Sequence, residues 1–318
     1  MRVFDSVLFA VNREDHFVES QVVKKFNPKK MLMIGSGGCV ALSLKVVFPN
    51  LDLDVVDVNP NQISHINKKI RAIESSKLEE LNVNLKNDYC LNQIGEFDKM
   101  FQNLRDLFIK YISNENEINR FFNIDTNTIS RLNILKGWLN NKNISIPFQK
   151  VFNDSNIKKV FSDEATKHGA PDSYVHYMQK KILDGFKKQE AHINPFLQHI
   201  FLGFYKSRFA FPYLNAKKIN APNLKQGSIL SVRNISSFDV ISLSNIFDWS
   251  GENLVAEHAD HLSQLHKGSV IIIRQINNHK NWIKIFDPYF EEDDAFDKYW
   301  KENDRSMFYD HIKLFIRK

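Results

Sequence analysis

Three side chains that could do chemistry follow one apolar segment near residue 240. The stretch FDVISLSNIFDWS, residues 238–250, begins like a buried strand and ends with Asn245, Asp248 and Trp249. An amide can bind a polar ligand group, a carboxylate can accept a proton, and an indole can offer its face to a cation. A helix cap with a core tryptophan is the structural alternative. The number of polar groups favours a functional site at the end of this strand.

A glycine-rich turn is the second feature of the sequence that can bind a ligand. In KKMLMIGSGGC, a short apolar strand is followed by Gly35, Ser36 and Gly37, and helical spacing then begins near Val40. Residues without Cβ allow a tight turn, which points backbone N–H groups toward a ligand at the positive end of the helix. Val40 replaces the third glycine of G-x-G-x-x-G, which argues against close passage of a pyrophosphate. A turn that only permits close packing is the alternative.

An acidic residue ends the next apolar strand. Asp57 closes the run LDLDVVD, 22 positions after Gly35. Asn59 and a proline then open another helix. A carboxylate at this point of a βαβ unit is where a ribose diol is held by two accepted hydrogen bonds, although a helix cap also explains it. Together these residues predict a ribose-bearing cofactor without a diphosphate, which S-adenosylmethionine fits better than NAD.

The elements that must position these side chains follow an α/β pattern that a helical region interrupts. Strand-like runs near residues 30 and 52 are followed, after residue 226, by GSILSV, FDVISLS, GSVIIIRQI and HIKLFIRK. Helical spacing dominates between them, as in EFDKMFQNLRDLFIKYI and DSYVHYMQKKILDGFKKQ. We therefore predict a Rossmann-like α/β sheet with a large helical insertion that covers its carboxyl edge as a lid. The predicted boundaries are 1–64 and 216–318 for the two parts of the cofactor-binding domain and 65–215 for the insertion.

Composition limits the class of protein. The 318 residues are 43% hydrophobic and suffice for one large domain or two ordinary ones. The stretch MRVFDSVLFAVNREDHF has only a short apolar run, so we expect neither a signal sequence nor a transmembrane span. Two cysteines without metal spacing indicate a reducing compartment and predict a cytoplasmic protein. The net charge of +6 comes from scattered lysines, and we expect no nucleic-acid partner.

Histidines are the remaining candidate ligands. His258 and His261, in the segment HADH, are three positions apart, a spacing that can bind zinc. No third or fourth ligand stands at a suitable spacing, and the sequence has no P-loop, G-x-S-x-G or zincin motif. We therefore predict no metal site and no hydrolase or phosphotransferase chemistry.

Four segments together resemble one known family. MIGSGGCVALSLKVVFPNLDLDVVDVNPNQ, INPFLQHIFLGFY, FPYL and DVISLSNIFDW are similar, also in their order, to blocks of the betaine-lipid synthase family, the S-adenosylmethionine:diacylglycerol 3-amino-3-carboxypropyltransferases. The resemblance covers most of the chain, from NRED near residue 12 to the last strand. It implies a class I methyltransferase-like fold that transfers the aminocarboxypropyl chain of S-adenosylmethionine and releases methylthioadenosine.

The resemblance also gives the stretch after residue 240 specific roles. Asn245 is expected to fix the methionyl amine or carboxylate of the cofactor, and Trp249 to shield the sulfonium. Asp248 is expected to accept or orient the proton of the acceptor, because a hydroxyl or amine is a poor nucleophile while it keeps its proton. In RFAFPYL, Tyr213 is expected to line the acceptor site, with core packing as the alternative.

Further cofactor contacts are expected at two other places. NRED is similar to a family block with a Trp-Glu-Asp run, so Glu14 and Asp15 are expected at the ammonium group of the cofactor. The tryptophan is missing here, and a solvated charged turn is the alternative. In NLKQGSI, Gly227 and Ser228 are candidates for the loop beside adenine. Asp88, in KNDY, is the competing candidate if the third strand precedes the insertion.

Several acceptors are compatible with these residues. The family resemblance suggests a diacylglycerol hydroxyl, which requires at least transient contact with a membrane. The aromatic tract PFLQHIFLGFYKSRFAFPYL offers a surface for that contact, or else forms the core of the insertion. A small soluble acceptor and cyclisation by the cofactor's own amine are alternatives. A methyltransferase would release S-adenosylhomocysteine instead, and a non-catalytic binding protein would bind the cofactor without turnover.

Overall fold

A mixed sheet of seven strands forms the centre of the part of the chain that the structure describes, residues 5–161, 163–167, 170–277 and 283–318. In this computed structural model the strand order is β3-β2-β1-β4-β5-β7-β6. The strands are β1 (Lys30–Ile34), β2 (Asp52–Asp57), β3 (Asn223–Gln226), β4 (Val240–Ser242), β5 (Val270–Gln275), β6 (Phe290–Glu292) and β7 (His311–Arg317).

The strands from β3 to β5 run parallel, and β7 runs antiparallel between β5 and β6. β1 pairs with β2 from Lys30↔Asp52 to Ile34↔Val56, and its other edge pairs with β4. Strands in the middle of such a sheet are buried on both faces, which explains the continuous apolar sequences of β1 and β5. The predicted α/β architecture is confirmed.

Helices cover both faces of the sheet. Alternate residues of β1 show the division: Met31 and Met33 belong to one apolar cluster, and Leu32 belongs to the other. The face of Met31 packs against α1 (His16–Phe26), α2 (Cys39–Val47), α3 (Pro60–Glu74) and α13 (Asp294–Asn303). The face of Leu32 packs against α11 (Glu252–Leu262), α12 (Ile283–Phe286) and the short 3₁₀ turns η6 (Ile229–Ser231) and η7 (Ile235–Ser237).

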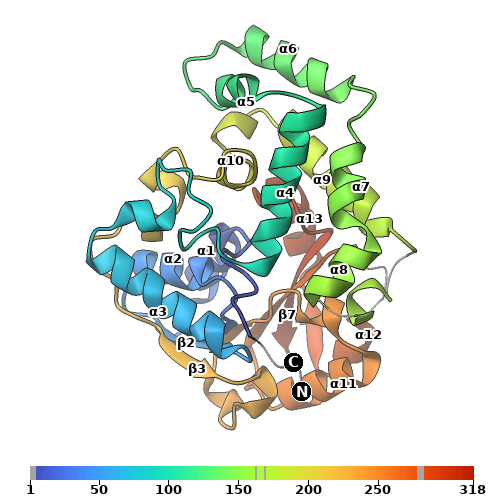
Figure 1. Ribbon diagram of the computed structural model, residues 1–318. Coiled ribbons are helices and arrows are strands. Elements are labelled where there is room, and N and C mark those ends of the chain that lie inside the picture. The colour runs from blue at the N-terminus through green and yellow to red at the C-terminus, as the bar shows by residue number, and fades with distance from the viewer. Residues whose placement is uncertain (1–4, 162, 168–169, 278–282) are drawn as a thin grey trace.

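A helical region lies between α3 and β3 and forms the upper part of the molecule in Figure 1. Its helices are α4 (Glu96–Tyr111), α5 (Glu115–Phe121), α6 (Thr128–Leu139), α7 (Ile146–Phe152), α8 (Asp154–Phe161), α9 (Ser173–Lys187) and α10 (Pro195–Phe201). The helix α3 packs on β2 and β3, so the region separated from the sheet begins after residue 74 rather than at residue 65.

The interior of this helical region is aromatic. Trp138 lies within 5.4 Å, between ring centroids, of Phe108, Phe121 and Phe186. Most of the tract 195–214, including the whole of α10, is buried in the same cluster. Most of its rings pack inward and belong to the core, whereas the ring of Phe209 is 69% exposed. No described helix is both long enough and apolar enough to cross a membrane.

One predicted strand is wrong by a few residues. GSILSV, residues 227–232, contains the 3₁₀ turn η6, and the strand β3 lies just before it in the polar sequence NLKQ. Gly227 ends the pairing with a φ of +153°, a backbone conformation that L side chains rarely adopt. β3 is an edge strand and mostly exposed, so it lacks the apolar pattern that reveals the central strands.

Candidate functional site

A cavity of about 450 Å³ opens at the carboxyl ends of the parallel strands. The turns after β1, β2, β3 and β4 line it, together with residues 8–14 and with α4, α8 and α9 of the helical region. From β1 the sheet continues to β2 on one side and to β4 on the other. The cavity therefore lies at the topological switch point, where open α/β sheets bind ligands.

The glycine turn after β1 serves mainly to bring the backbone close to the N-terminal segment. A Cβ on Gly37 would lie 2.4 Å from the backbone of Val11. The amide of Cys39, at the start of α2, donates to Oδ1 of Asn12 at 2.8 Å. The positive end of α2 is thus capped by the protein itself, which agrees with a ligand that has no diphosphate. Within the turn, Ser36 lines the cavity, whereas Gly35 and Gly37 do not.

Gly37→Ala is expected to lower the free energy of unfolding by about 1–3 kcal/mol, because the added methyl group overlaps backbone that cannot rotate away. Gly137→Ala in α6 is the matched control, since a Cβ there meets nothing within 4 Å. In a helix this control should stabilise the protein by roughly 0.4–1 kcal/mol. Urea denaturation of both variants measures the difference. Equal stability of the two variants would contradict the close approach at Gly37.

Asp57 lines the cavity at the end of β2 and holds the glycine turn in place. Its two carboxylate oxygens accept hydrogen bonds from the amides of Ser36 and Asn59, each at 2.9 Å. Burial raises the pKa of Asp57 to about 6, although both amide hydrogen bonds favour the ionised form. Each carboxylate oxygen has a further lone pair for a ligand hydroxyl. Asn59 also lines the cavity, but its side chain is bonded within the protein: Oδ1 caps α3 by accepting from the Asn61 amide, and Nδ2 donates to the carbonyl of Ser6.

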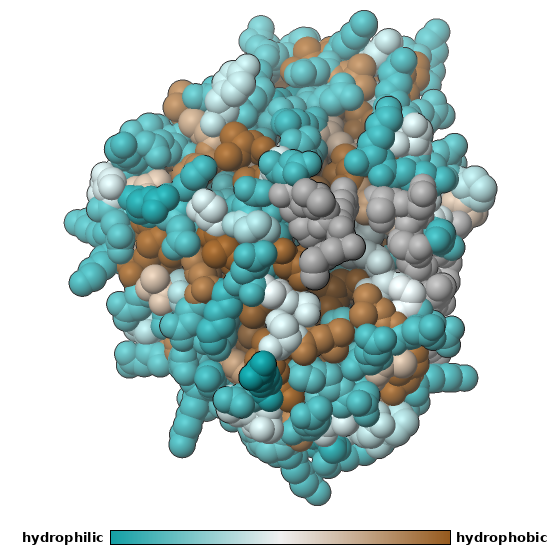
Figure 2. All heavy atoms as spheres, turned by 60° about the horizontal axis from the view of Figure 1, so that its bottom comes forward, coloured by the Kyte–Doolittle hydropathy of each residue, from teal (hydrophilic) through white to brown (hydrophobic). Residues whose placement is uncertain are grey.

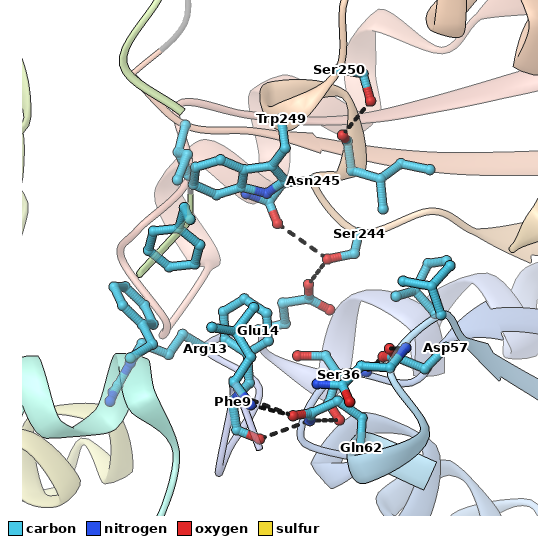
Figure 3. A pocket seen from close by; sticks show the side chains of 18 of the residues that line it. Phe9, Arg13, Glu14, Ser36, Asp57, Gln62, Ser244, Asn245, Trp249 and Ser250 are labelled. Carbon is cyan, nitrogen blue, oxygen red and sulfur yellow. Dashed lines mark hydrogen bonds between the residues drawn. The ribbon is translucent and has the colours of Figure 1, made fainter. Parts of the chain in front are cut away.

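Gln62 joins the turn after β1 to the N-terminal segment. Its Nε2 donates to the carbonyls of Phe9 and Ser36, and its Oε1 accepts from the amides of Leu8 and Phe9. All four of these backbone groups belong to residues that line the cavity (Figure 3). Gln62 is not among the site residues predicted from the sequence, although a polar residue on the buried face of a helix is a signal that could have indicated it.

Glu14 is the second acid that lines the cavity. It accepts a very short hydrogen bond from the Ser244 hydroxyl at the end of β4, and Tyr309 donates to it at 3.3 Å. Figure 3 shows Glu14 and Ser244 turned toward each other, with Asp57 beside Ser36. Burial raises the pKa of Glu14, and the guanidinium of Arg274, 3.6 Å away, opposes that shift.

Arg274 is held in turn by a second carboxylate. Its Nη1 and Nη2 donate to the two oxygens of Glu19 at 2.6 and 2.9 Å. The Ser242 hydroxyl also donates to Glu19, at 2.8 Å. All members of this network are buried. Arg274 is not among the residues predicted from the sequence, although a cation in the otherwise apolar strand VIIIRQ indicates a buried ion pair.

Asp15 lies outside the cavity, unlike its neighbour. Its carboxylate forms a bidentate ion pair with Arg305 at 2.6 and 2.7 Å and caps α1 through the amide of Phe17. This pair ties the start of α1 to the segment before β7. The expected contact of Asp15 with a cofactor is therefore replaced by a structural role.

Of the three site residues predicted in the stretch after β4, two line the cavity and the third is buried. Asn245 and Trp249 line the cavity, and the ring of Trp249 stacks on Phe161 of α8 with centroids 4.7 Å apart. Asp248 is buried and does not line it. Its carboxylate accepts from the amide of Ile276 at 2.9 Å and from Nδ2 of Asn245 at 3.2 Å. The expected role of Asp248 as a proton acceptor therefore becomes one of positioning Asn245.

Four more residues singled out from the sequence are placed as follows. Gly227 and Ser228 follow β3 and line the cavity. Asp88 instead pairs with Arg105 at 2.7 Å, and it does not line the cavity. Tyr213 is fully buried, where its hydroxyl lies 3.2 Å from Nδ2 of Asn92, and it does not line the cavity either. Tyr213 therefore has the packing role that the sequence left open.

Arg13, Ser250 and His258 also line the cavity. The remaining lining is apolar and falls into two groups. Phe9, Phe97, Phe308 and residues of α8 and α9 form an aromatic wall on the side of the helical region. Ile229, Leu230, Ile246 and Leu254 line the other side. Among the described residues, no group of three or more His, Cys, Asp and Glu side chains could hold a metal ion.

Neither the protein-family models nor the curated proteins with which the chain was compared give a match.

Proposed function

We propose that this protein binds S-adenosylmethionine and transfers its 3-amino-3-carboxypropyl group to a hydroxyl or amine acceptor, releasing methylthioadenosine. One observation carries the proposal: a single cavity at the switch point is lined by two separate buried acids, Asp57 and Glu14. A ribose diol and an ammonium group are the complementary partners of two such carboxylates. S-Adenosylmethionine carries both groups. A nucleoside diphosphate would instead need free amides at the start of α2, where the Cys39 amide already donates to Asn12.

The lining supports one orientation of the cofactor. Asp57 accepts both ribose hydroxyls, and the base extends past Ser228 toward the apolar side chains of η6 and α11. Glu14 binds the ammonium group beside Ser244, and the amide of Asn245 binds the methionyl carboxylate. Asp248 acts through Asn245, because it holds that amide by a hydrogen bond. Trp249 presents its ring to the sulfonium from the side opposite Phe161.

We further propose that the sheet is of the class I methyltransferase-like kind. The order β3-β2-β1-β4-β5 is that of a doubly wound nucleotide-binding sheet. The antiparallel β7 between β5 and β6 supports the assignment, because a dinucleotide-binding sheet of order 3-2-1-4-5-6 has no reversed strand there.

The proposed reaction is a displacement at the γ-carbon of the methionyl chain. A lone pair of the acceptor oxygen or nitrogen forms the new bond to this carbon as the C–S bond breaks. The bonding electrons pass to sulfur, so the sulfonium becomes the neutral thioether of methylthioadenosine, and the proton of the acceptor passes to the bulk solvent. The protein contributes by holding the acceptor in line with the C–S bond at roughly 3–3.5 Å and by excluding water.

The aromatic wall favours an apolar acceptor such as a diacylglycerol. Phe9, Phe97 and Phe161 lie together, with centroids 4.9–5.9 Å apart, next to the cavity. Val58 and Leu254 also line the cavity and are 50% and 39% exposed. On the face shown in Figure 2, apolar side chains gather across the middle, which suits transient contact with a membrane.

Mass spectrometry of the nucleoside products tests the proposal. Purified protein is incubated with S-adenosylmethionine and a lipid extract, and the products are compared with those of a control without protein. Methylthioadenosine above this control is expected. S-Adenosylhomocysteine instead would identify a methyltransferase and overturn the proposed transfer. Binding of the cofactor with neither product would indicate a non-catalytic binding protein.

The affinity for methylthioadenosine is expected to fall at acid pH. Asp57 accepts two hydroxyl hydrogens only while it is ionised, and its pKa is raised by burial to about 6. As the pH falls below this value, the protonated form dominates and the dissociation constant should rise about tenfold per pH unit. Methylthioadenosine has no ammonium group, so the charge of Glu14 does not enter its binding directly. Calorimetry between about pH 5 and pH 8 measures the effect, and a constant affinity over this range would contradict it.

A further inference from the structure

We propose that His258 recognises the 6-amino group of the adenine base and makes the cavity selective for adenosine-type over inosine-type nucleosides. This inference rests on the proposed function, since it assigns one more group of the same ligand. It also gives a role to a histidine that lines the cavity but has no place in the transfer reaction.

The hydrogen bonding of His258 leaves one ring nitrogen for a ligand. Nδ1 lies 2.7 Å from the carbonyl oxygen of Leu254, one turn earlier in α11. A carbonyl oxygen can only accept, so Nδ1 carries the proton. Within the described part of the chain Nε2 has no hydrogen-bond partner. Burial lowers the pKa of His258, which keeps the ring neutral and Nε2 an acceptor.

The surroundings of His258 suit a flat apolar base. The side chain is 6% exposed and lines the cavity, and its ring meets Phe247 edge to face with centroids 5.4 Å apart. α11 packs against η6, which brings His258 to the side chains of Ile229 and Leu230 after β3. This is the end of the cavity beyond Ser228, where the orientation fixed by Asp57 directs the base.

The acceptor at Nε2 distinguishes two purines by one functional group. The 6-amino group of adenine donates a hydrogen bond to it. The 6-oxo group of hypoxanthine only accepts, so two acceptors would face each other without water. Leaving a buried acceptor unpaired costs about 1–3 kcal/mol, so we expect the amino nucleoside to bind about 10-fold to 100-fold more tightly.

Calorimetry with three probes tests this assignment: methylthioadenosine, its 6-oxo analogue methylthioinosine, and the analogue with hydrogen at carbon 6. In the wild-type protein the amino compound should bind most tightly and the oxo compound least. His258→Phe keeps a ring of similar shape but removes the acceptor, so the preference for amino over oxo should fall to within about twofold through weaker binding of methylthioadenosine.

His261→Phe is the matched control, because it is the same substitution three positions along the same helix, at a side chain that does not line the cavity. This variant should keep the wild-type preference. Equal affinities of the wild-type protein for the amino and oxo compounds would overturn the role of His258, and so would an unchanged preference in His258→Phe. If none of the three compounds binds the wild-type protein, the proposed function itself fails.

Discussion

Asp57→Ala is expected to weaken the binding of both S-adenosylmethionine and methylthioadenosine by at least about 100-fold. The carboxylate would accept two hydrogen bonds from the ribose diol, and hydrogen bonds to a charged group each contribute roughly 1.5–3 kcal/mol, while each 1.4 kcal/mol is tenfold in affinity. Alanine also leaves the amide of Ser36 without its partner, so the turn that bounds the cavity becomes less ordered. Both ligands lose affinity because both contain the ribose.

Asp54→Ala is the matched control for this prediction. Asp54 lies on the same strand, but its carboxylate pairs with Lys225 and Asn223 of the neighbouring strand β3 and does not line the cavity. Calorimetry on the wild-type protein and both variants compares them under one condition. Asp54→Ala should bind both ligands like the wild-type protein. Wild-type affinity in Asp57→Ala would show that the ribose lies elsewhere.

The sequence predicted those parts of the fold that are buried on both sides. The apolar runs of β1, β4 and β5 stand out because most side chains there are buried, and α4 and α9 show the spacing of helices with one buried face. The edge strand β3 was not predicted at its actual position, because its sequence NLKQ is polar and mostly exposed. The helical region begins after residue 74 and not at the predicted residue 65. The sequence does not reveal this because α3 has the same periodicity as the helices that follow it.

The site was predictable where chemistry depends on spacing along the chain. The glycine turn and Asp57 belong to one βαβ unit, so their meeting follows from the local pattern. The direction in which a side chain points does not follow from the local sequence pattern. Asp248 stands in the expected turn, yet its carboxylate is held by the amide of Ile276, a contact between strand ends that no local pattern indicates. The contact of Glu14 with Ser244 likewise joins residues 230 positions apart.

Among the described residues, two acids and one cation line the cavity: Asp57, Glu14 and the buried guanidinium of Arg13, which pairs with Asp98 at 2.9 Å. Burial raises the pKa of both Asp57 and Glu14, so each ionised carboxylate lacks part of the solvation it would have in water. Arg274 compensates Glu14 only in part, because its guanidinium is bound more closely by Glu19. Under the proposed function, the ammonium group of S-adenosylmethionine supplies positive charge next to Glu14.

Glu14→Gln is expected to weaken the binding of S-adenosylmethionine by about 100-fold, because breaking a buried pair of opposite charges costs roughly 2–5 kcal/mol. Methylthioadenosine lacks the aminocarboxypropyl chain, so its affinity should not change. The fold should persist, since Arg274 keeps its bidentate pair with Glu19. Calorimetry with both ligands gives the ratio of the two dissociation constants, which isolates the ammonium contact from the ribose contact.

Asp15→Asn provides the control for Glu14→Gln, because it removes one negative charge at the adjacent residue, where the carboxylate binds Arg305 outside the cavity. This variant should keep the wild-type ratio of affinities even if its stability falls. An equal loss for both ligands in Glu14→Gln would mean that the substitution disturbs the whole cavity. An unchanged ratio would place the ammonium group away from Glu14. Only a selective loss for S-adenosylmethionine, beside the loss of both ligands in Asp57→Ala, assigns the two acids to the two ends of one cofactor.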